Sequence, residues 1–458
     1  MELKEIHSVY FLGIGGIGMS ALARWFNANG YKVAGYDKTA TPLTDALVSE
    51  GIEIHFEDDV NLIGDGFKDK KSTLVVYTPA VPKNHTELNF FLTNDFDVKK
   101  RAAVLGILTR QYFTIAVAGT HGKTTTSSMV AHILHESGVN TMAFVGGILQ
   151  NYNSNLILND PNGKAPIVVV EADEFDRSFM QLSPNISIVT TVDPDHLDIY
   201  DSAEEFNKTF EDFVQKLPVD GELIYNKGTC KINLTNLKAS TKSYGLGKAD
   251  VYADAIKAQD GEQVFDFFGR ENIKGIKLGL PGLHNIQNAM SAIEACLQVG
   301  VSGDEVKAAL ATYKGVKRRF EYVIKNKDVV YVDDYAHHPS ELNALIESVR
   351  YLFPDKKLTM VFQPHLYSRT NDFMDDFASS LAKVDELFLL DIYPARELPM
   401  PGVTSEALFS KIDHHKKTLT TKAHLMKDLN SVKTEVFVTA GAGDIDTFIN
   451  PIKEMLSK

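Results

Sequence analysis

A glycine-rich segment, GTHGKTTT at residues 119–126, follows an apolar, β-branched run at 113–117 and precedes a helical pattern at 124–137. A strand, a glycine loop and a helix in this order are typical of a phosphate-binding loop. Successive backbone N–H groups would surround the phosphates, Lys123 would meet the β/γ charge, and the Thr124 hydroxyl would meet Mg²⁺. A threonine-rich helix start is the simpler alternative, but it leaves the strand, glycines and lysine unexplained. The predicted phosphate-binding residues are Gly119, Thr120, His121, Gly122, Lys123, Thr124 and Thr125.

A second glycine motif, G-x-G-x-x-G, occupies residues 13–18 near the N-terminus. It follows an apolar run at 9–12 and precedes a helical pattern at 19–26 and a strand-like run at 32–36. Such glycines let backbone N–H groups approach a pyrophosphate at a helix N-terminus, and Asp37 at the end of the next strand could bond a ribose hydroxyl. A tight turn alone is the structural alternative. The motif leaves open whether the ligand is a dinucleotide or a UDP-sugar, since both carry a pyrophosphate.

Two further apolar runs, at 167–170 and 186–190, are predicted to be buried parallel strands that end in polar residues. The first is followed by EADEFD at 171–176 and the second by TVDPDHLD at 191–198. Ligands bind beyond the carboxyl ends of strands in open α/β sheets. Several carboxylates this close together are costly without a cation, and Mg²⁺ takes carboxylate and phosphate oxygens. These endings therefore predict a magnesium site, although a solvated acidic loop would give a similar pattern.

The segment GLHNIQNA at 282–289 begins an alanine-rich helical pattern. Asparagine side chains can pair with adenine N6 and N7, and they also cap helices, so both interpretations stay open. Beyond residue 315, four strand-like runs are each followed by polar residues, which suggests a ligand-binding edge. These polar segments are DDYAHHP at 333–339, QPHLYSRT at 363–370, DIYPAR at 391–396 and GAGD at 441–444, and a cationic cluster, KRR, stands at 317–319.

The chain has 458 residues, which favours about three domains. We expect three α/β, doubly wound domains at 1–108, 109–314 and 315–458. The net charge of −13 argues against nucleic-acid binding, which depends on basic surface. No segment offers 18 uninterrupted apolar residues and the N-terminus does not have the pattern of a signal peptide, so neither a membrane span nor secretion is expected. The two cysteines are not in a CxxC pattern, which suits a reducing compartment, and we expect a cytoplasmic protein.

Taken together, these motifs resemble the Mur ligase family of ATP-dependent, amide-forming enzymes of peptidoglycan precursor synthesis. The resemblance covers essentially the whole chain and keeps the family's motif order: GTHGKTTT, EADE, DPDH, GLHNIQNA, KRRFE, DDYAHHP and QPHLYSRT. It implies a Rossmann-like N-terminal domain for a UDP-sugar, a central P-loop ATPase-type domain with a mainly parallel sheet, and a C-terminal Rossmann-like domain for the amino acid and closure. GIGGIGMS, DDYAHHP and QPHLYSRT are most similar to the members that join L-alanine to the lactyl carboxylate of UDP-N-acetylmuramate.

The resemblance also implies roles for single residues. The residues similar to the uridine-diphosphate loop are Gly15, Gly16, Ile17, Gly18, Met19 and Ser20, with Asp37. The ligands implied for Mg²⁺, or for Mn²⁺ in its place, are Thr124, Glu171 and His196. The adenine-facing pair is His284 and Asn288, and Asp334 faces the ribose or the bound nucleotide. The residues implied near the phosphates, the amino acid and the acyl phosphate are Arg319, Tyr335, His337 and Arg369. Leu366 departs from relatives that carry arginine there, which removes one expected guanidinium.

The implied reaction agrees with this inventory of residues. A carboxylate is too poor an electrophile to react with an amine, so the γ-phosphoryl group of ATP would first form an acyl phosphate. Lys123, Mg²⁺ and Arg319 would offset the repulsion between the two anions. The amine must be neutral to attack, and His337 or water could take its proton. We therefore predict Lys123, His337, Arg319 and Arg369 as catalytic residues. Closure of the third block would shield the acyl phosphate from water.

Three alternatives remain from the sequence. A nicotinamide-dependent dehydrogenase would use the first glycine motif but leaves the phosphate loop and EADE unexplained. A nucleotide-dependent switch module would use the phosphate loop without any amino acid. A related ligase that recycles the murein tripeptide is the nearest alternative, although its pyrophosphate loop usually departs from GIGG. The sequence leaves open the preference among L-alanine, glycine and L-serine, and it is compatible with a monomer or a homodimer.

Overall fold

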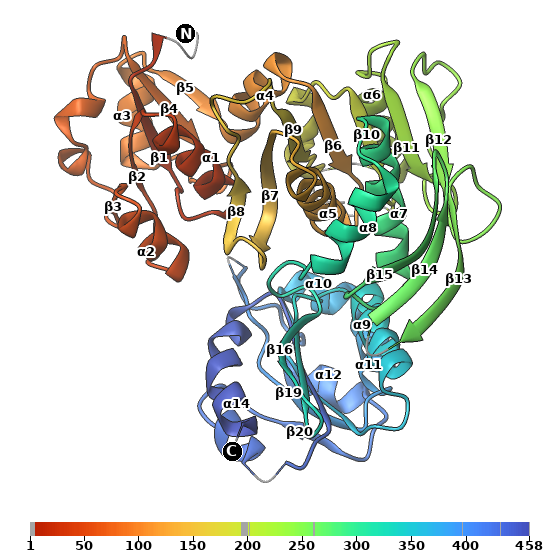
Figure 1. Ribbon diagram of the computed structural model, residues 1–458. Helices are drawn as coiled ribbons and strands as arrows, with labels where there is room; N and C mark the ends of the chain where they lie inside the picture. The colour runs from red at the N-terminus through yellow and green to blue at the C-terminus, as the bar shows by residue number, and fades with distance from the viewer. Residues whose placement is uncertain are drawn as a thin grey trace. The chain divides into compact units, whose positions relative to one another are not determined.

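The structure is a computed structural model that describes residues 5–193, 200, 202–259, 262–395, 397–430 and 432–457. The chain forms two compact units (Figure 1). The first comprises Met1–Ala255, Phe265–Ile276 and Gln287–Tyr313, and the second comprises Ile256–Val264, Lys277–Ile286 and Lys314–Lys458. The part of the chain that the structure describes contains no helix long and apolar enough to cross a membrane.

The first unit begins with a five-stranded, fully parallel sheet in the order β3-β2-β1-β4-β5. Its strands are β1 (Ser8–Leu12), β2 (Lys32–Tyr36), β3 (Glu53–His55), β4 (Thr73–Tyr77) and β5 (Asp97–Lys100). Its α-helices are α1 (Ile17–Ala28), α2 (Pro42–Ser49), α3 (Thr86–Thr93) and α4 (Arg101–Gln111). The strand order reverses between β1 and β4, and such switch points form ligand crevices at the carboxyl ends of strands. The predicted glycine motif follows β1 directly, so it lies at this crevice.

A seven-stranded sheet forms the rest of the first unit's framework, in the order β12-β11-β10-β6-β9-β7-β8. Its strands are β6 (Thr114–Ala118), β7 (Thr141–Leu149), β8 (Ser154–Ile157), β9 (Ile167–Glu171), β10 (Ile186–Val189), β11 (Glu222–Asn226) and β12 (Ser240–Tyr244). All neighbours run parallel except β8, which is antiparallel to β7. Strands β6 and β10 are buried along their whole length, which explains their continuous apolar sequences.

Helices and a 3₁₀ segment accompany these strands. They are α5 (Lys123–Glu136), the 3₁₀ segment η4 (Phe175–Gln181), α6 (Ala203–Val214), α7 (Leu283–Gln298) and α8 (Gly303–Thr312). Helix α5 packs against β6, β7 and β9 (Figure 1). The first turn of α5 therefore stands at the carboxyl ends of the central strands, beside the acidic residues that follow β9.

A separate three-stranded sheet, in the order β13-β14-β15, was not predicted from the sequence. Its strands are β13 (Tyr252–Gln259), β14 (Glu262–Phe268) and β15 (Asn272–Leu278). In β14 fully buried residues alternate with partly exposed ones, so polar residues interrupt the apolar ones. A search for continuous apolar runs misses such strands, because one face of each strand stays in contact with water.

The second unit is built on a six-stranded sheet in the order β16-β17-β21-β18-β19-β20. Its strands are β16 (Glu321–Lys325), β17 (Val330–Asp334), β18 (Leu358–Phe362), β19 (Glu386–Leu389), β20 (Lys417–Leu419) and β21 (Val436–Ala440). Only β16, at one edge, is antiparallel to its neighbour. The α-helices described here are α9 (Pro339–Leu352), α10 (Tyr367–Asp372), α11 (Met374–Leu381), α12 (Ser405–Lys411), α13 (Leu425–Leu429) and α14 (Ile449–Leu456). The predicted α/β class with mainly parallel sheets is confirmed.

Candidate active site

The predicted phosphate loop connects β6 to α5, and both of its glycines have backbone angles that other residues rarely adopt. Gly119 has φ +131° and Gly122, the N-cap of α5, has φ +83°. A Cβ on Gly119 would lie 2.1 Å from Thr190 Oγ1. The loop is fixed from β10's side, because Thr120 N–H and His121 N–H donate to Thr191 O and Oγ1, both at 2.9 Å. The sequence thus folds this turn into a rigid loop at the N-terminus of α5, where an anion is favoured.

Lys123 is the first residue of α5, and its ammonium group is folded back over the loop. Its Nζ donates to Gly119 O at 2.6 Å and to the two carboxylate oxygens of Glu174 at 2.8 and 2.9 Å. Burial acts to lower the pKa of Lys123, but the carboxylates of Glu174, Glu171 and Asp173 raise it above its ordinary value. The lysine is therefore charged at neutral pH and stands where the end of a triphosphate would meet it.

Glu174 is the partner of Lys123 that sequence reasoning did not single out, although it belongs to the predicted acidic segment. Its side chain is only 2% exposed. The Tyr200 hydroxyl donates to Glu174 O at 2.6 Å, which fixes the backbone of this segment. A buried carboxylate needs a paired cation, so each charge of this pair depends on the other. Nothing in the sequence distinguishes Glu174 from the three other acids of the segment, because the pairing depends on the turn after β9.

Glu171, at the end of β9, meets the Thr124 hydroxyl. Thr124 Oγ1 donates to the two Glu171 oxygens at 2.9 and 3.1 Å, and Gly146 N–H donates to Oε2 at 3.0 Å. A carboxylate and a hydroxyl at the N-terminus of a phosphate-loop helix suit Mg²⁺, which completes its shell with phosphate oxygens and water. Among the described residues, no group of three or more His, Cys, Asp or Glu could hold a metal by itself. His196, predicted as a third ligand, lies outside the described residues.

Asn288, in α7, lies against the phosphate loop. A Cβ on Gly122 would lie 2.7 Å from Asn288 Oδ1, so the glycine is what lets α7 approach the loop this closely. The side chain of Asn288 is 7% exposed. His284, the other predicted adenine-facing residue, belongs to the second unit, and its side chain is exposed. Within the first unit, the structure therefore places Asn288 beside the phosphate loop.

The N-terminal glycine motif is held in place by two of its predicted ligand-binding neighbours. Gly15 N–H donates to Asp37 Oδ2 at 2.7 Å, so Asp37 orients the loop from β2. Ser20 is fully buried, and its hydroxyl donates to Ile17 O at 2.9 Å and accepts from Asn155 Nδ2 at 2.9 Å. Within the described structure, these two side chains position the loop through protein contacts.

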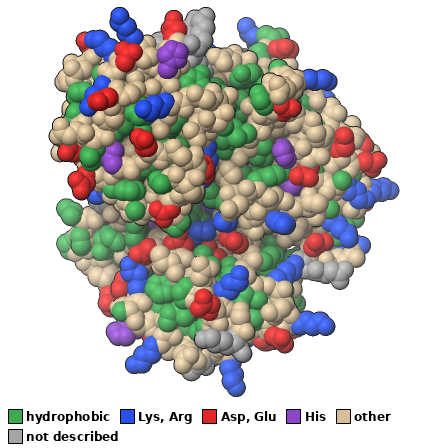
Figure 2. All heavy atoms as spheres, turned by 60° about the vertical axis from the view of Figure 1, so that its left-hand side comes forward, with side chains coloured by type: hydrophobic (Ala, Val, Ile, Leu, Met, Phe, Trp, Pro, Cys, Tyr) green, Lys and Arg blue, Asp and Glu red, His purple; other side chains and the backbone are tan. Residues whose placement is uncertain are grey.

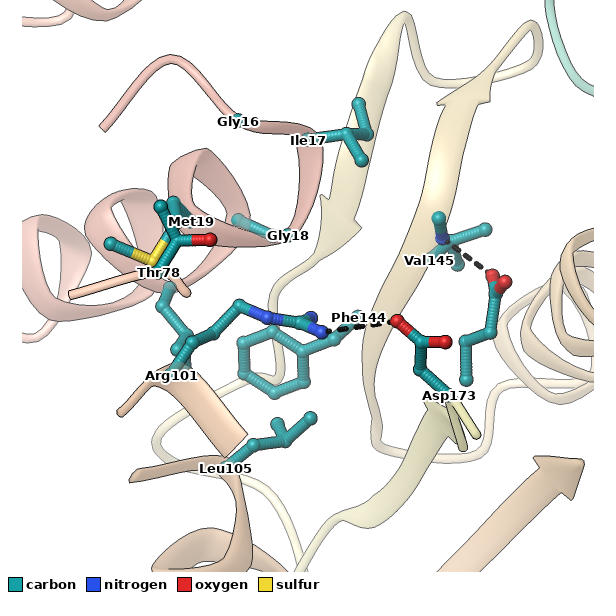
Figure 3. A pocket seen from close by; sticks show the side chains of 14 residues that line it. Gly16, Ile17, Gly18, Met19, Thr78, Arg101, Leu105, Phe144, Val145 and Asp173 are labelled. Atoms are coloured by element: carbon teal, nitrogen blue, oxygen red, sulfur yellow. Dashed lines mark hydrogen bonds and ion pairs between the residues drawn. The ribbon is translucent and has the colours of Figure 1, made fainter. Parts of the chain in front are cut away.

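A cavity of about 290 Å³ connects this motif to the acidic end of β9 (Figure 3). From the glycine motif and α1 it is lined by Gly16, Ile17, Gly18, Met19, Ala21 and Leu22, and from elsewhere by Thr78, Arg101, Leu105, Phe144, Val145, Gly146, Glu171 and Asp173. One end thus offers the N-terminus of α1 and the other offers the carboxylates beside the phosphate loop. All of these residues belong to the first unit. Sequence reasoning missed Arg101 and Phe144, because their segments carry no motif.

The second unit gathers the predicted polar residues at the carboxyl ends of β17 and β18. Asp334 accepts from Phe320 N–H at 2.6 Å and from Ala336 N–H at 2.8 Å, and burial raises its pKa to about 6 while Arg319 opposes that shift. Arg319 lies 3.8 Å from Glu341 and with its guanidinium 5.4 Å from the centre of the Tyr335 ring. These groups surround one strand end, so the cationic side chain of Arg319 is available at this edge.

Arg318, the neighbour of Arg319, has a structural role. It pairs with the fully buried Asp333 at 3.2 Å and donates to Gly441 O at 2.5 Å, which ties β17 to the loop after β21. Burial raises the pKa of Asp333 to about 7, and Arg318 opposes that shift. Of the two adjacent arginines in the KRR cluster, Arg318 therefore stabilises the fold, whereas Arg319 lies at the polar edge.

His337 and Arg369 lie close to His365 at the same edge. His337 Nδ1 is 2.8 Å from Tyr335 O, and its ring centre is 6.0 Å from that of His365. Arg369 Nη1 is 3.2 Å from His365 Nδ1. Burial lowers the pKa of His337 below its ordinary value, as do Arg369 and Arg319, while Glu341 opposes them. Burial, His337 and Arg369 lower the pKa of His365 to about 4, while Glu397 opposes them. Both imidazoles are therefore neutral at pH 7 and able to accept a proton.

Leu366 begins the turn from β18 into α10 with φ +70°, a backbone angle that a leucine seldom adopts. Its N–H donates to Tyr393 O at 2.9 Å, which fixes the turn. The sequence could not predict this strain, since nothing near Leu366 marks a left-handed residue. An arginine here would add a cation beside Arg369, and its absence leaves Arg369 as the guanidinium of this turn.

If His337 takes a proton during the reaction, kcat/KM should be constant near neutral pH and fall as the pH drops through its lowered pKa, below 6.5. The neutral imidazole accepts the proton, and its protonated form cannot. His337→Gln should remove this acidic limb and lower kcat by about 10²-fold. A pH–rate profile measures both effects. His338→Asn, which keeps an N-cap acceptor for α9, is the matched control and should retain the limb. A wild-type limb in His337→Gln would show that another base acts.

Comparison with known proteins assigns the chain to a family. The domain described as "Mur ligase family, catalytic domain" matches residues 8–113, the "Mur ligase middle domain" matches 117–296, and the "Mur ligase, glutamate ligase domain" matches 318–445. A UDP-N-acetylmuramate–L-alanine ligase of Cytophaga hutchinsonii is 50% identical over 457 residues, which cover 99% of this chain and 97% of that protein. The chain belongs to the Mur ligase family.

Two further Mur ligases are similar to this chain over nearly its full length. A UDP-N-acetylmuramate–L-alanine ligase of Parabacteroides distasonis is also 50% identical, over 100% of this chain and 99% of that protein. The crystal structure of the UDP-N-acetylmuramate–alanine ligase of Thermotoga maritima superposes with a TM-score of 0.83 at 27% identity, covering 98% and 99% of the two chains. The predicted family and the three-domain α/β fold of Mur ligases are therefore confirmed.

Proposed function

We propose that this Mur ligase joins L-alanine to the lactyl carboxylate of UDP-N-acetylmuramate and converts ATP to ADP and phosphate. The product is UDP-N-acetylmuramoyl-L-alanine, and the intermediate is an acyl phosphate. The observation that carries the proposal is the cavity in the first unit, which joins a pyrophosphate-type glycine loop to the acidic residues beside a phosphate loop. A dehydrogenase would use the glycine motif alone, and a switch module would use the phosphate loop alone. Neither alternative explains a cavity that joins the two. Relatives of 50% identity that bear this ligase name support the choice of substrates.

The first step brings an anionic carboxylate against an anionic triphosphate, so the chain must supply positive charge. Lys123 is a buried ammonium held at the loop by Gly119 O and Glu174, which supports our proposal that it binds the β/γ phosphates. A preorganised cation in a poorly solvated site stabilises developing charge more than one in water. We assign the same role at the second unit's polar edge to Arg319.

Thr124 and Glu171 would hold Mg²⁺ beside the phosphates, since their oxygens already face each other at about 3 Å. When bound, the ion neutralises phosphate charge and orients the triphosphate, and Mn²⁺ would substitute for it. His196 remains a proposed third ligand. Asn288 and His284 are proposed to face the adenine, and Asp334 the ribose.

In the second step the amine of alanine attacks the acyl phosphate and phosphate leaves. The attacking amine must lose a proton, and His337, whose pKa is lowered by burial, is neutral and able to accept it. Arg369 and Tyr335 are proposed to bind the amino acid at the same edge, because a guanidinium pairs well with the α-carboxylate. Neither cysteine forms a disulfide, which agrees with a cytoplasmic enzyme, and we propose a monomer or homodimer.

Phosphate release with Mg-ATP and UDP-N-acetylmuramate tests the proposal. Separate addition of L-alanine, L-serine, glycine and L-Ala-γ-D-Glu-meso-diaminopimelate should give the highest kcat/KM with L-alanine. One methyl group or hydroxyl in a pocket changes binding by about 1–3 kcal/mol, so serine and glycine should be about 10- to 100-fold poorer. Release that depends on no amino acid would indicate a switch module. A preference for the tripeptide would assign the recycling reaction instead.

A further inference from the structure

Arg101 lies in the cavity between the N-terminus of α1 and the acidic end of β9. Its guanidinium extends past Phe144 toward Asp173 (Figure 3). The side chain is 26% exposed, and the ion pair with Asp173 is 3.7 Å long, which is beyond hydrogen-bond distance. A guanidinium with five donors thus faces the cavity opposite a carboxylate that it does not bind directly.

The position of Arg101 in its helix does not stabilise the fold. It is the first residue of α4, and the first turn of that helix contains no acidic residue. A cation at a helix N-terminus is unfavourable, because the free N–H groups carry partial positive charge there. Its neighbour Lys100, by contrast, forms an ion pair of 2.6 Å with Asp176, and Arg110 occupies the favourable last turn of the same helix. An anion would therefore stabilise Arg101 at this position, and the carboxylate that the described structure places nearest to it, Asp173, is 3.7 Å away.

The glycine motif is shaped around this guanidinium. A Cβ on Gly18 would lie 2.3 Å from Arg101 Nη1 and 3.0 Å from its Cζ. Gly18 therefore lets the arginine pass directly beneath the first turn of α1. One ligand could consequently meet the N–H groups of α1 and the arginine fork at the same time. A sugar nucleotide with a diphosphate at one end and a carboxylate at the other has these two anionic groups.

We propose that Arg101 binds the carboxylate of the sugar-nucleotide substrate and holds it toward the phosphate loop. The inference rests on the proposed function and names a residue for the reacting group. The diphosphate would occupy the N-terminus of α1, whereas the guanidinium, with Nη1 beside Gly18, presents its Nη2 toward Asp173 on the acidic side of the cavity (Figure 3). The lining also includes Leu22, Leu105 and Phe144, which reduce the water around the pair. A planar guanidinium binds a carboxylate through two parallel hydrogen bonds, which fixes its orientation.

Calorimetric binding of two ligands to the full chain tests this role. UDP-N-acetylmuramate carries the lactyl carboxylate, and UDP-N-acetylglucosamine carries the same diphosphate without it. Arg101→Met should weaken binding of the first ligand by about 10- to 100-fold, as expected for hydrogen bonds to a charged group, and change the second by less than about threefold. Arg101→Lys keeps the charge but loses the fork, so it should give an intermediate loss and provides a second variant if Arg101→Met fails to fold.

Arg110→Met is the matched control, because it removes an arginine from the same helix but outside this cavity. It should leave both affinities unchanged. Equal losses for both ligands in Arg101→Met would place the arginine on the diphosphate and overturn the proposal, as would unchanged affinities. If the wild-type chain bound neither ligand and formed no product, the proposed function itself would fail, and this result is distinct from a failure of the arginine assignment.

Discussion

Replacing Lys123 with alanine is expected to lower kcat by at least about 10³-fold, since a cation at the transferred phosphoryl group contributes about that much or more in related chemistry. The ammonium donates to Gly119 O in the loop, and its charge is secured by Glu174. Under the proposed function UDP-N-acetylmuramate would bind at the glycine motif at the far end of the cavity, so its affinity should change by less than about threefold. Phosphate release and calorimetry measure the two effects separately.

The control for this prediction must address stability, because Lys123→Ala leaves Glu174 buried without its cation. Removing one partner of a buried pair costs about 3–5 kcal/mol. The double variant Lys123→Met with Glu174→Gln removes both charges and should restore the folded state while remaining inactive. Lys208→Ala, on the exposed face of α6, should behave as wild type. Turnover by the double variant would show that the lysine does not act on phosphate.

The elements that could be predicted best from the sequence are strands that are followed directly by a polar loop. Continuous apolar runs marked β1, β6, β9, β10 and β18, because strands buried on both faces must be apolar throughout. The polar residues that follow these strands lie at their carboxyl ends, as expected for parallel sheets. Strands with one face in contact with water, such as β14, were missed because their residues alternate between polar and apolar. A search for continuous apolar runs does not detect this alternation.

Pairings across the fold could not be predicted. That Lys123 pairs with Glu174, and not with Asp173 or Asp176, depends on the turn after β9, where two successive residues, Asp176 and Arg177, have φ near +50°. Asp37 and Ser20 are predicted to contact a ligand, and the sequence did not indicate that they also have partners within the protein. Residue type and spacing identified the loops, whereas the three-dimensional packing decides which side chain in each loop faces the cavity.

The two ends of the cavity have different electrostatic requirements. The α1 end offers N–H groups, the Thr78 hydroxyl and the cation of Arg101, while the β9 end carries Glu171 and Asp173. An anionic substrate that crosses the cavity therefore approaches two carboxylates, which repel it unless a cation is bound there. Lys123 cannot compensate for both, because Glu174 already shares its charge. A divalent cation at Thr124 and Glu171 would reverse the sign of the local electric field. Because this cation would need Glu171 as a ligand, replacing Glu171 is expected to have the second large effect on turnover.

Glu171→Gln is accordingly expected to lower kcat by about 10²-fold at ordinary Mg²⁺ concentrations and to raise the Mg²⁺ concentration that gives half-maximal rate by about 10- to 100-fold. The amide keeps an acceptor for Thr124 and Gly146 but provides a weaker, uncharged ligand. A titration of phosphate release with Mg²⁺ measures the shift. Thermal stabilisation by Mg-ADP gives a readout independent of turnover, and it should require correspondingly more Mg²⁺ in the variant.

Asp176→Asn is the matched control for this experiment, because it changes an acid to its amide in the same segment. Asp176 pairs with Lys100 at the surface, 2.6 Å away, and does not line the cavity. Exposed ion pairs contribute about 1 kcal/mol or less, so this variant should fold normally and keep the wild-type Mg²⁺ curve. An unchanged curve in Glu171→Gln would exclude Glu171 as a ligand. Equal shifts in both variants would instead indicate a general effect of negative charge, because only one of the two carboxylates faces Thr124.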